Sequence, residues 1–188
     1  MKKVKPYLIE FAIVTAGVLI ALFLSNIKEN NQARKYHIAS IGTINMEVQD
    51  NYSNLERIVE KQMSLLDTLI KYTNDSESTI LDLFKKSNGL QIATIKNAGL
   101  DFYKNDQINS IDFKIMAALI QMKSSSDLID SKAQRLTGFT YSNILDNSTK
   151  SKTVVILYLQ NLLDTENQLL ELYEEFINEN IEIEHNTK

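Results

Sequence analysis

Glycine, proline and cysteine are scarce in this sequence, and the scarcity excludes several classes of protein. The 188 residues include five Gly and one Pro, whereas average usage of about 7% and 5% would give roughly 22. Sandwiches, barrels and doubly wound α/β folds need turn residues at regular intervals, so these folds are nearly excluded. Because 44% of the residues are hydrophobic and 23% are charged, wholesale disorder is excluded as well. The composition predicts an all-α protein.

The chain also lacks the residues of most catalytic and metal sites. Without Cys there are no disulfides, thiolate nucleophiles or zinc ribbons. A di-metal carboxylate site needs two Glu-x-x-His pairs. Only Glu182 and His185 form one, since Arg34 precedes His37 at the required position. No phosphate loop or nucleophile elbow is present. We therefore expect that the protein binds no metal or cofactor and is not an enzyme. The net charge of -4 argues against a nucleic-acid partner.

The sequence has one long hydrophobic run, Tyr7–Leu24, whose only charged residue is Glu10. Eighteen helical residues span ~27 Å, close to the roughly 30 Å hydrocarbon core of a bilayer. The run is preceded by Lys2, Lys3 and Lys5, which by the positive-inside rule keep the N-terminus cytoplasmic. We expect a single-pass anchor in a bacterial inner (cytoplasmic) membrane, with the C-terminal domain in the periplasm.

A cleavable signal peptide is the alternative for this run, because it too has a charged start and an apolar stretch. Cleavage requires small residues at the -3 and -1 positions. A cut after Ser25 or Ala21 would place Phe23 or Leu19 at -3. The run is also longer than the usual signal core of about 7 to 15 residues. The sequence therefore favours an uncleaved anchor.

One face of the predicted membrane helix combines small residues with the acidic one. Its members are Glu10, Ile13, Val14, Gly17, Ala21 and Leu24. The spacing of Gly17 and Ala21 is a small-xxx-small pair, which lets helices approach closely. The face thus predicts packing against another membrane helix, either of a partner protein or of a second copy. Alternatively, and in our interpretation preferably, Glu10 reaches the cytoplasmic interface and pairs with Lys3 or a lipid head group.

The anchor also carries a longer residue pattern. Ile9-Glu10-Phe11-Ala12-Ile13-Val14 is followed by Gly17-Val18-Leu19-Ile20-Ala21-Leu22 and by Ser25-Asn26-Ile27-Lys28-Glu29. This order resembles the pattern G-E-I-x-L-V-x-x-G-I-L-I-A-L-x-I-N-N-W-N-E of a family of uncharacterised single-pass bacterial membrane proteins, with Ile9 and Ile27 replacing its Gly and Trp. Residues 94–108 are similar to a second family segment. The resemblance implies the topology, and because the family has no assigned activity it supplies no chemistry.

The sequence divides into a tail and anchor over residues 1–26, a juxtamembrane stalk over 27–38 and a helical domain over 39–188. The first helix of that domain shows an apolar stripe of Ile41, Ile44, Val48, Tyr52, Leu55, Val59, Met63, Leu66 and Ile70. Its mean spacing near 3.6 residues suits a nearly straight helix rather than a left-handed supercoil. We hypothesise that this helix continues unbroken from the anchor, from Tyr7 to Tyr72.

Further helices are predicted beyond a polar turn at residues 73–78. Two short helices over 79–86 and 90–98 end at Asn88-Gly89 and Gly99. In the loop after them, the side chains expected to close the core are Leu100, Phe102, Tyr103 and Ile108. A third helix starting near Ser110 is expected to bury Phe113, Met116, Ala117, Ile120, Leu128, Ala133, Leu136, Phe139 and Ile144. A last helix over 150–183 is expected to bury Val155, Leu159, Leu162, Leu169, Tyr173 and Phe176.

These elements predict a single transmembrane helix followed by an extramembrane four-helix-like bundle. Gly42 and Gly138 are expected to mark bends or close contacts in the long helices. The row of Glu171, Glu175 and Glu179 is expected to form a solvated face. Two function classes remain. The first is a non-enzymatic interaction or scaffold subunit of a larger inner-membrane complex, which the sequence favours by fold analogy. The alternative is an extracytoplasmic ligand-binding sensory module.

Overall fold

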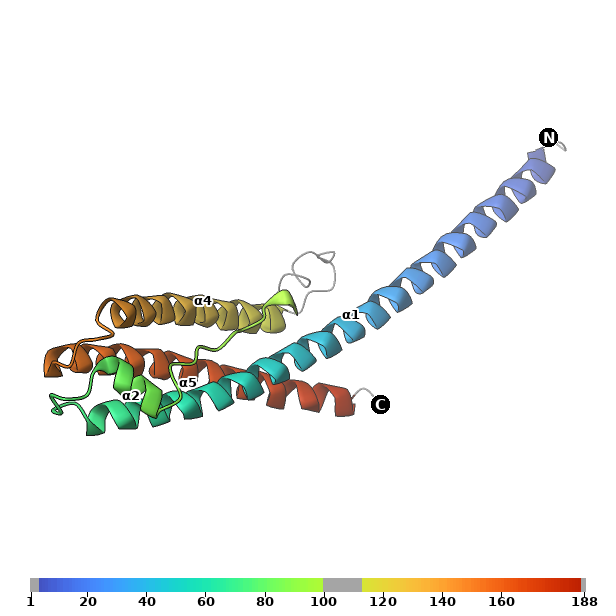
Figure 1. The fold of residues 1–188 in the computed structure, drawn as a ribbon. Helices are drawn as coiled ribbons and strands as arrows, with labels where there is room; N and C mark the ends of the chain where they lie inside the picture. The colour runs from blue at the N-terminus through green and yellow to red at the C-terminus, as the bar shows by residue number, and fades with distance from the viewer. Residues whose placement is uncertain (1–3, 100–112, 187–188) are drawn as a thin grey trace. The chain divides into compact units, whose positions relative to one another are not determined.

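A computed structural model describes residues 4–99 and 113–186 of the chain (Figure 1). The helices with defined bounds are α1 (Val4–Lys71), α2 (Ile80–Lys86), α4 (Phe113–Ser142) and α5 (Thr149–Asn186). No strand occurs in these two ranges. The predicted all-α class is therefore confirmed. Helix α1 is unbroken over the span proposed for the anchor and the first soluble helix.

The chain divides into two compact units, which are described separately. Residues 1–42 form the anchor unit and residues 43–188 the helical unit. Within the helical unit, α4 and α5 lie side by side and run antiparallel, joined by a short turn (Figure 1). The part of α1 that belongs to this unit lies along α5, where Gln62 bonds to Glu166 and Lys152 bonds to the carbonyl of Tyr72.

The buried positions of the three long helices alternate by four and three residues. In α1 they include residues 44, 48, 51, 55, 58, 62, 65 and 69. In α4 they are 115, 119, 122, 126, 129, 133, 136 and 140, and in α5 they include 152, 155, 159, 162, 166, 169, 173 and 176. This is the heptad spacing of left-handed coiled coils. It differs from the 3.6-residue stripe that the apolar residues of the first helix predicted.

The difference arises because polar residues occupy some of the heptad positions. Asn51 and Gln62 are buried in α1, so a stripe traced through apolar residues alone is displaced by one position along the helix. Ile44, Val48, Leu55 and Val59 are buried as predicted. Beyond them the prediction is wrong, since the exposed fractions of Met63 and Ile70 are 53% and 51%, and Leu66 is half-buried. Leu65 and Leu69 fill the core instead.

The predicted inner face of α4 is wrong in its first half. Phe113, Ala117, Ile120 and Leu128 are exposed and Met116 is half-buried. The residues buried in their place are Ile115, Leu119, Met122, Ser126 and Ile129. Farther along, Ala133 and Leu136 are buried as predicted, whereas Phe139 and Ile144 are half-buried. In α5 the six predicted core residues from Val155 to Phe176 are all buried. The Glu171, Glu175 and Glu179 row is exposed, as expected.

Helix α2 begins and ends at the predicted signals. Thr79 is its N-cap and forms a capping box with Asp82, each side chain accepting from the other residue's backbone N–H. The helix is followed by Asn88 and Gly89, whose φ angles of 61° and 82° lie in the left-handed region. That conformation ends the helix and turns the chain back along α1.

The helix predicted over residues 90–98 is wrong. Residues 90–97 have no helical structure and run as an extended segment along α1. The β-branched Ile92, Thr94 and Ile95 favour this extended backbone. The predicted core side chains Leu100, Phe102, Tyr103 and Ile108, and the start of the third helix at Ser110, lie outside the described residues.

Candidate functional site

The predicted membrane-packing face lies on the anchor unit. Glu10, Ile13, Gly17, Ala21 and Leu24 follow each other at helical spacing in α1 and therefore share one face. All five are exposed, and a Cβ added at Gly17 would meet nothing within 4 Å. The structure thus leaves this face, with its small residues Gly17 and Ala21, open to a neighbouring surface.

Of the three lysines that predict the topology, Lys2 and Lys3 lie outside the described residues. Lys5 is the second residue of α1.

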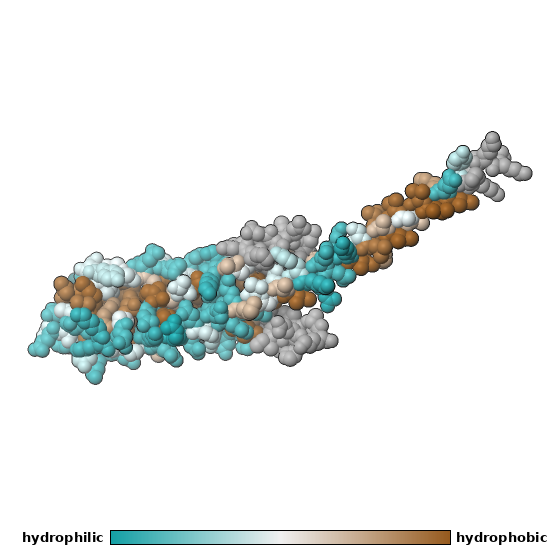
Figure 2. All heavy atoms as spheres, turned by 45° about the vertical axis from the view of Figure 1, so that its right-hand side comes forward, coloured by the Kyte–Doolittle hydropathy of each residue, from teal (hydrophilic) through white to brown (hydrophobic). Residues whose placement is uncertain are grey.

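Apolar side chains cover the whole circumference of this part of α1, as the brown segment in Figure 2 illustrates for one face. The large ones, between 43% and 71% exposed, are Tyr7, Ile9, Phe11, Ile13, Val14, Val18, Leu19, Ile20, Leu22, Phe23, Leu24 and Ile27. Among the described helices, α1 is long and apolar enough to cross a membrane, with a mean hydropathy of 2.0 in its most apolar window. The prediction of one candidate membrane-spanning helix near the N-terminus is confirmed.

A second arrangement, which the sequence did not predict, lies in the helical unit. There the extended segment, residues 90–97, and Gly99 just after it are held by polar side chains of α1 that bind their backbone. The Asn51 amide is 4% exposed and bonds to Lys96 twice. Its Nδ2 donates to the Lys96 carbonyl at 2.7 Å, and its Oδ1 accepts from the Lys96 N–H at 3.0 Å. The Asn51 amide thus makes the same pair of hydrogen bonds to Lys96 that a residue of a neighbouring antiparallel strand would make.

Two further α1 side chains, on either side of Asn51, bind the extended segment and the residues just after it. Asn54 donates to the carbonyl of Thr94 at 3.1 Å, and the Glu47 carboxylate accepts from the Gly99 N–H at 3.0 and 3.1 Å. A Cβ added at Gly99 would lie 3.0 Å from the Ile44 side chain. The close approach of backbone to helix therefore occurs at Gly99. It does not occur at Gly42 or Gly138, where open space surrounds the backbone and our prediction of a close contact is wrong.

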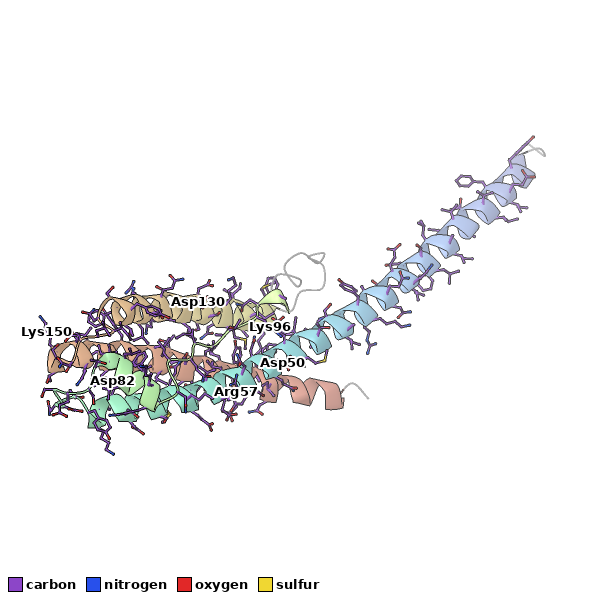
Figure 3. The ribbon with its side chains drawn as sticks, in the orientation of Figure 1. Asp50, Arg57, Asp82, Lys96, Asp130 and Lys150 are labelled. Carbon is purple, nitrogen blue, oxygen red and sulfur yellow. The ribbon has the colours of Figure 1, made fainter. Side chains whose placement is uncertain are left out.

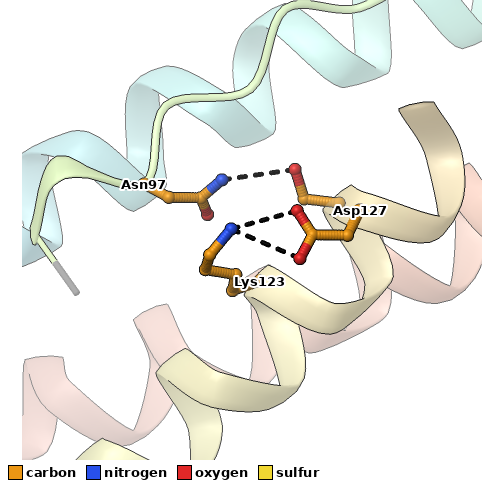
Figure 4. A network of polar contacts seen from close by, with 4 residues as sticks. Asn97, Lys123 and Asp127 are labelled. Carbon is orange, nitrogen blue, oxygen red and sulfur yellow. Dashed lines mark hydrogen bonds and ion pairs between the residues drawn. The ribbon is translucent and has the colours of Figure 1, made fainter. Parts of the chain in front are cut away.

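The extended segment is joined to α4 as well. Asn97 Nδ2 donates to Ser126 Oγ at 3.3 Å, next to an ion pair of Lys123 and Asp127 on the same helix (Figure 4). The ion pair is an i,i+4 pair on a partly exposed surface, so it contributes at most about 0.5 kcal/mol. The segment thus bridges α1 and α4 through backbone-directed and side-chain contacts.

A cluster of the buried Gln62 and Glu166 with the half-buried Gln91 connects the segment to α5. Gln62 Nε2 donates to the Gln91 carbonyl at 2.9 Å and to Glu166 Oε1 at 3.0 Å. Gln62 and Glu166 are 1% and 0% exposed. Burial raises the pKa of the Glu166 carboxyl from 4.5 to about 7, against a smaller lowering by the Gln62 hydrogen bond. Gln62 Oε1 and Glu166 Oε2 have no hydrogen-bond partner among the described residues.

Among the described residues of the helical unit, Lys152 is the other buried charged group, and it lies at the C-terminal end of α1. Its Nζ donates to the carbonyl of Tyr72 at 3.2 Å and to that of Asp75. An ammonium beside the last carbonyls of a helix is stabilised by the helix dipole. Other charged side chains lie on the outside of the unit, for example Asp50, Arg57, Asp130 and Lys150 (Figure 3).

Sequence reasoning missed Asn51, Gln62, Lys152 and Glu166 because a polar residue was taken as a sign of exposure. The signal that could have found them is the heptad itself. Asn51, Gln62 and Glu166 each lie three or four residues from apolar core positions on both sides, and Lys152 lies three residues before the core residue Val155. In the part of the chain that is described, no group of three or more His, Cys, Asp or Glu residues is placed to hold a metal ion.

The chain matches no protein-family model, no curated protein and no solved structure. The resemblance of its anchor to the uncharacterised single-pass family consequently rests on the residues quoted for it. Functional inference rests on the two arrangements above: the open apolar face of the anchor unit, and the buried polar contacts of the helical unit.

Proposed function

We propose that this protein is a membrane-anchored, non-enzymatic interaction subunit of a larger complex in a bacterial inner membrane. The N-terminal part of α1 spans the bilayer with residues 1–6 in the cytoplasm, and the helical unit lies in the periplasm. The orientation is argued from Lys2, Lys3 and Lys5. The family resemblance of the anchor supports the same topology.

The uncovered apolar surface of α1 is the observation that carries the proposal. Residues 7–27 present twelve large apolar side chains, each at least 43% exposed. Burying one such side chain is worth about 1.5–3 kcal/mol, so leaving all of them in water would cost on the order of 20 kcal/mol. That exceeds the typical stability of a whole domain, about 5–15 kcal/mol. An apolar environment such as a bilayer removes this cost.

The partner surface within the membrane is the face of Glu10, Ile13, Gly17, Ala21 and Leu24. A smooth groove at Gly17 and Ala21 allows close packing with a second helix, where association depends on van der Waals contact. Glu10 favours a polar partner if it is buried there, since an unpaired carboxylate in hydrocarbon costs a few kcal/mol. If it reaches the interface instead, Lys3 or a lipid head group satisfies it.

In this proposal the helical unit is a rigid periplasmic module that presents its charged outer surface to a partner. It is a four-helix-like bundle in which the extended segment and α2 together occupy the fourth position beside α1, α4 and α5. Contacts from α1 to the backbone of the extended segment support this arrangement. The alternative function, a ligand-binding sensory module, stays a prediction, because no specific feature of the described residues favours it.

Recovery of the complex from native membranes in mild detergent tests the proposal. We expect the full chain to recover a stable membrane partner. Gly17→Leu fills the groove and should reduce that recovery at least several-fold, whereas Thr15→Leu adds a similar side chain on the opposite face of the helix and should not. Equal recovery with both variants would refute the assigned face.

A different result would refute the scaffold function itself. If the chain copurifies with no partner, or as a homodimer whose melting temperature shifts with a metabolite, the sensory alternative is supported. Variant protein must first be shown to insert in the membrane at wild-type levels, so that lost recovery reports on packing.

A further inference from the structure

The buried Glu166 carboxyl points to a function of the helical unit that is independent of the anchor. Glu166 is fully buried on α5 and receives one hydrogen bond, from Gln62 of α1. The same Gln62 amide also holds the extended segment at the carbonyl of Gln91. One amide group therefore joins α1, α5 and the extended segment.

The unpartnered atoms of this cluster show which form of Glu166 fits. Glu166 Oε2 and Gln62 Oε1 are both buried and both lack a hydrogen-bond partner in the described chain. Both are acceptors when the carboxyl is ionised, so neither can satisfy the other. A proton on Oε2 would make it a donor. An acid–amide pair would then be available, in which Oε2–H donates to Gln62 Oε1 while Gln62 Nε2 donates to Glu166 Oε1. The neutral form thus satisfies the two atoms at once.

We propose that Gln62, Glu166 and the Gln91 carbonyl form a proton-binding site that couples docking of the extended segment, residues 90–97, to the pH of the surrounding compartment. With the proton bound, the cluster is neutral and the Gln62 amide is fixed against both the segment and α5. Loss of the proton leaves a buried carboxylate with a single donor. Water must then reach it, and release of the extended segment from the Gln62 amide is the route that we assign.

The neighbouring charged groups do not neutralise this carboxylate. On α1, Lys61 donates at 3.0 Å to the side chain of Gln91 rather than to Glu166. On α4, Lys132 donates to Thr165 Oγ1 at 2.6 Å and to the Asn161 carbonyl of α5. Burial and the Gln62 hydrogen bond are the two influences on the Glu166 pKa, and burial is the larger. The value of about 7 places the change of charge in a physiological range.

The direction of the pH effect follows from these values. The folded protein binds the Glu166 proton up to about pH 7, whereas an ordinary Glu releases it near 4.5. Between these values the folded state holds more protons than the unfolded state, so stability falls as pH rises. The stabilisation is complete below pH 4.5 and is lost as pH rises through 7. The shift corresponds to a change of the unfolding equilibrium constant on the order of a hundredfold.

The variant Glu166→Gln tests the proposal, measured in the full chain in a non-ionic detergent. The new amide can accept from and donate to Gln62, so it mimics the protonated carboxyl without titrating. We expect backbone exchange of residues 90–97, corrected for its intrinsic pH dependence, to rise at least tenfold in the wild type from pH 5.5 to 8.5. In Glu166→Gln it should stay low throughout. Glu171→Gln makes the same charge change on the exposed face of α5 and should behave as the wild type does.

Two results would overturn the proposal. The first is an equal pH dependence of exchange in the wild type and Glu166→Gln, which would assign the effect to another titrating group. The second is a wild-type segment that exchanges equally slowly at both pH values, which would show that the proton does not control docking. If Glu166→Gln fails to fold, a carboxyl ¹³C titration of the wild type decides, and an apparent pKa below 5 for Glu166 would refute the site.

Discussion

Truncation of Asn51 to Ala should release the extended segment from α1, and its cost can be worked out from the contacts. Asn51 is buried and makes two bonds to the backbone of Lys96, at 2.7 and 3.0 Å. A neutral hydrogen bond contributes about 1 kcal/mol net to stability. Loss of both should therefore cost about 2 kcal/mol. For a unit of this size the melting temperature should fall by about 4–8 °C.

Asn54→Ala is the matched control. It lies on the same helix and also bonds the segment, but through a single 3.1 Å bond in an exposed setting. We expect a loss of about 0.5 kcal/mol, because water replaces an exposed partner easily. Both variants are compared as full chains in detergent, by thermal denaturation followed by circular dichroism and by exchange of the Lys96 amide. If Asn51→Ala is no less stable than Asn54→Ala, and the Lys96 amide exchanges no faster, the clamp does not hold the segment.

Two further variants test the turn signals around α2. Thr79→Ala removes the capping box and should cost about 1 kcal/mol, whereas Thr79→Ser keeps the hydroxyl and most of the stability; equal melting temperatures would contradict the cap. Gly89→Ala forces a side chain into a φ of 82° and should also cost about 1 kcal/mol. Gly138→Ala, at an open site inside α4, should instead stabilise by up to about 1 kcal/mol, and the same sign of change in both glycine variants would refute this account.

Local signals in the sequence predicted those parts of the fold that local interactions determine. The scarcity of Gly and Pro predicted the helices. Helix α2 begins after the polar turn at residues 73–78 and ends before Asn88 and Gly89, as expected. The inner face of α5 was predicted because six of its core positions are apolar. Each of these features follows from the residues within one or two helical turns.

The remaining features depend on partners far along the chain. Residues 90–97 are apolar enough for a short helix, and it is Asn51 and Gln62, some 30 to 45 residues earlier, that fix them as an extended segment. Glu166 looks like any polar residue of an amphipathic helix until Gln62 and the surrounding core enclose it. Such sites arise from long-range contacts, which hydrophobic periodicity does not encode.

For the candidate membrane face, too, some properties were predictable from the sequence and others were not. Its composition and its placement on one side of a helix were predictable from spacing alone. Its occupant is not encoded in the periodicity, because the contacts that would define it are made with another molecule.

The topology of the anchor is the claim on which the proposed function depends, and labelling of single cysteines tests it directly. The chain has no native Cys, so one can be introduced at exposed Ser76 in the helical unit or at Val4 at the start of α1. Intact bacterial cells are treated with a membrane-impermeant maleimide after their outer membrane is made permeable. The account predicts that Ser76→Cys is labelled at once and that Val4→Cys is labelled only after the inner membrane is disrupted. Labelling of Val4→Cys in intact cells, with protection of Ser76→Cys, would contradict it.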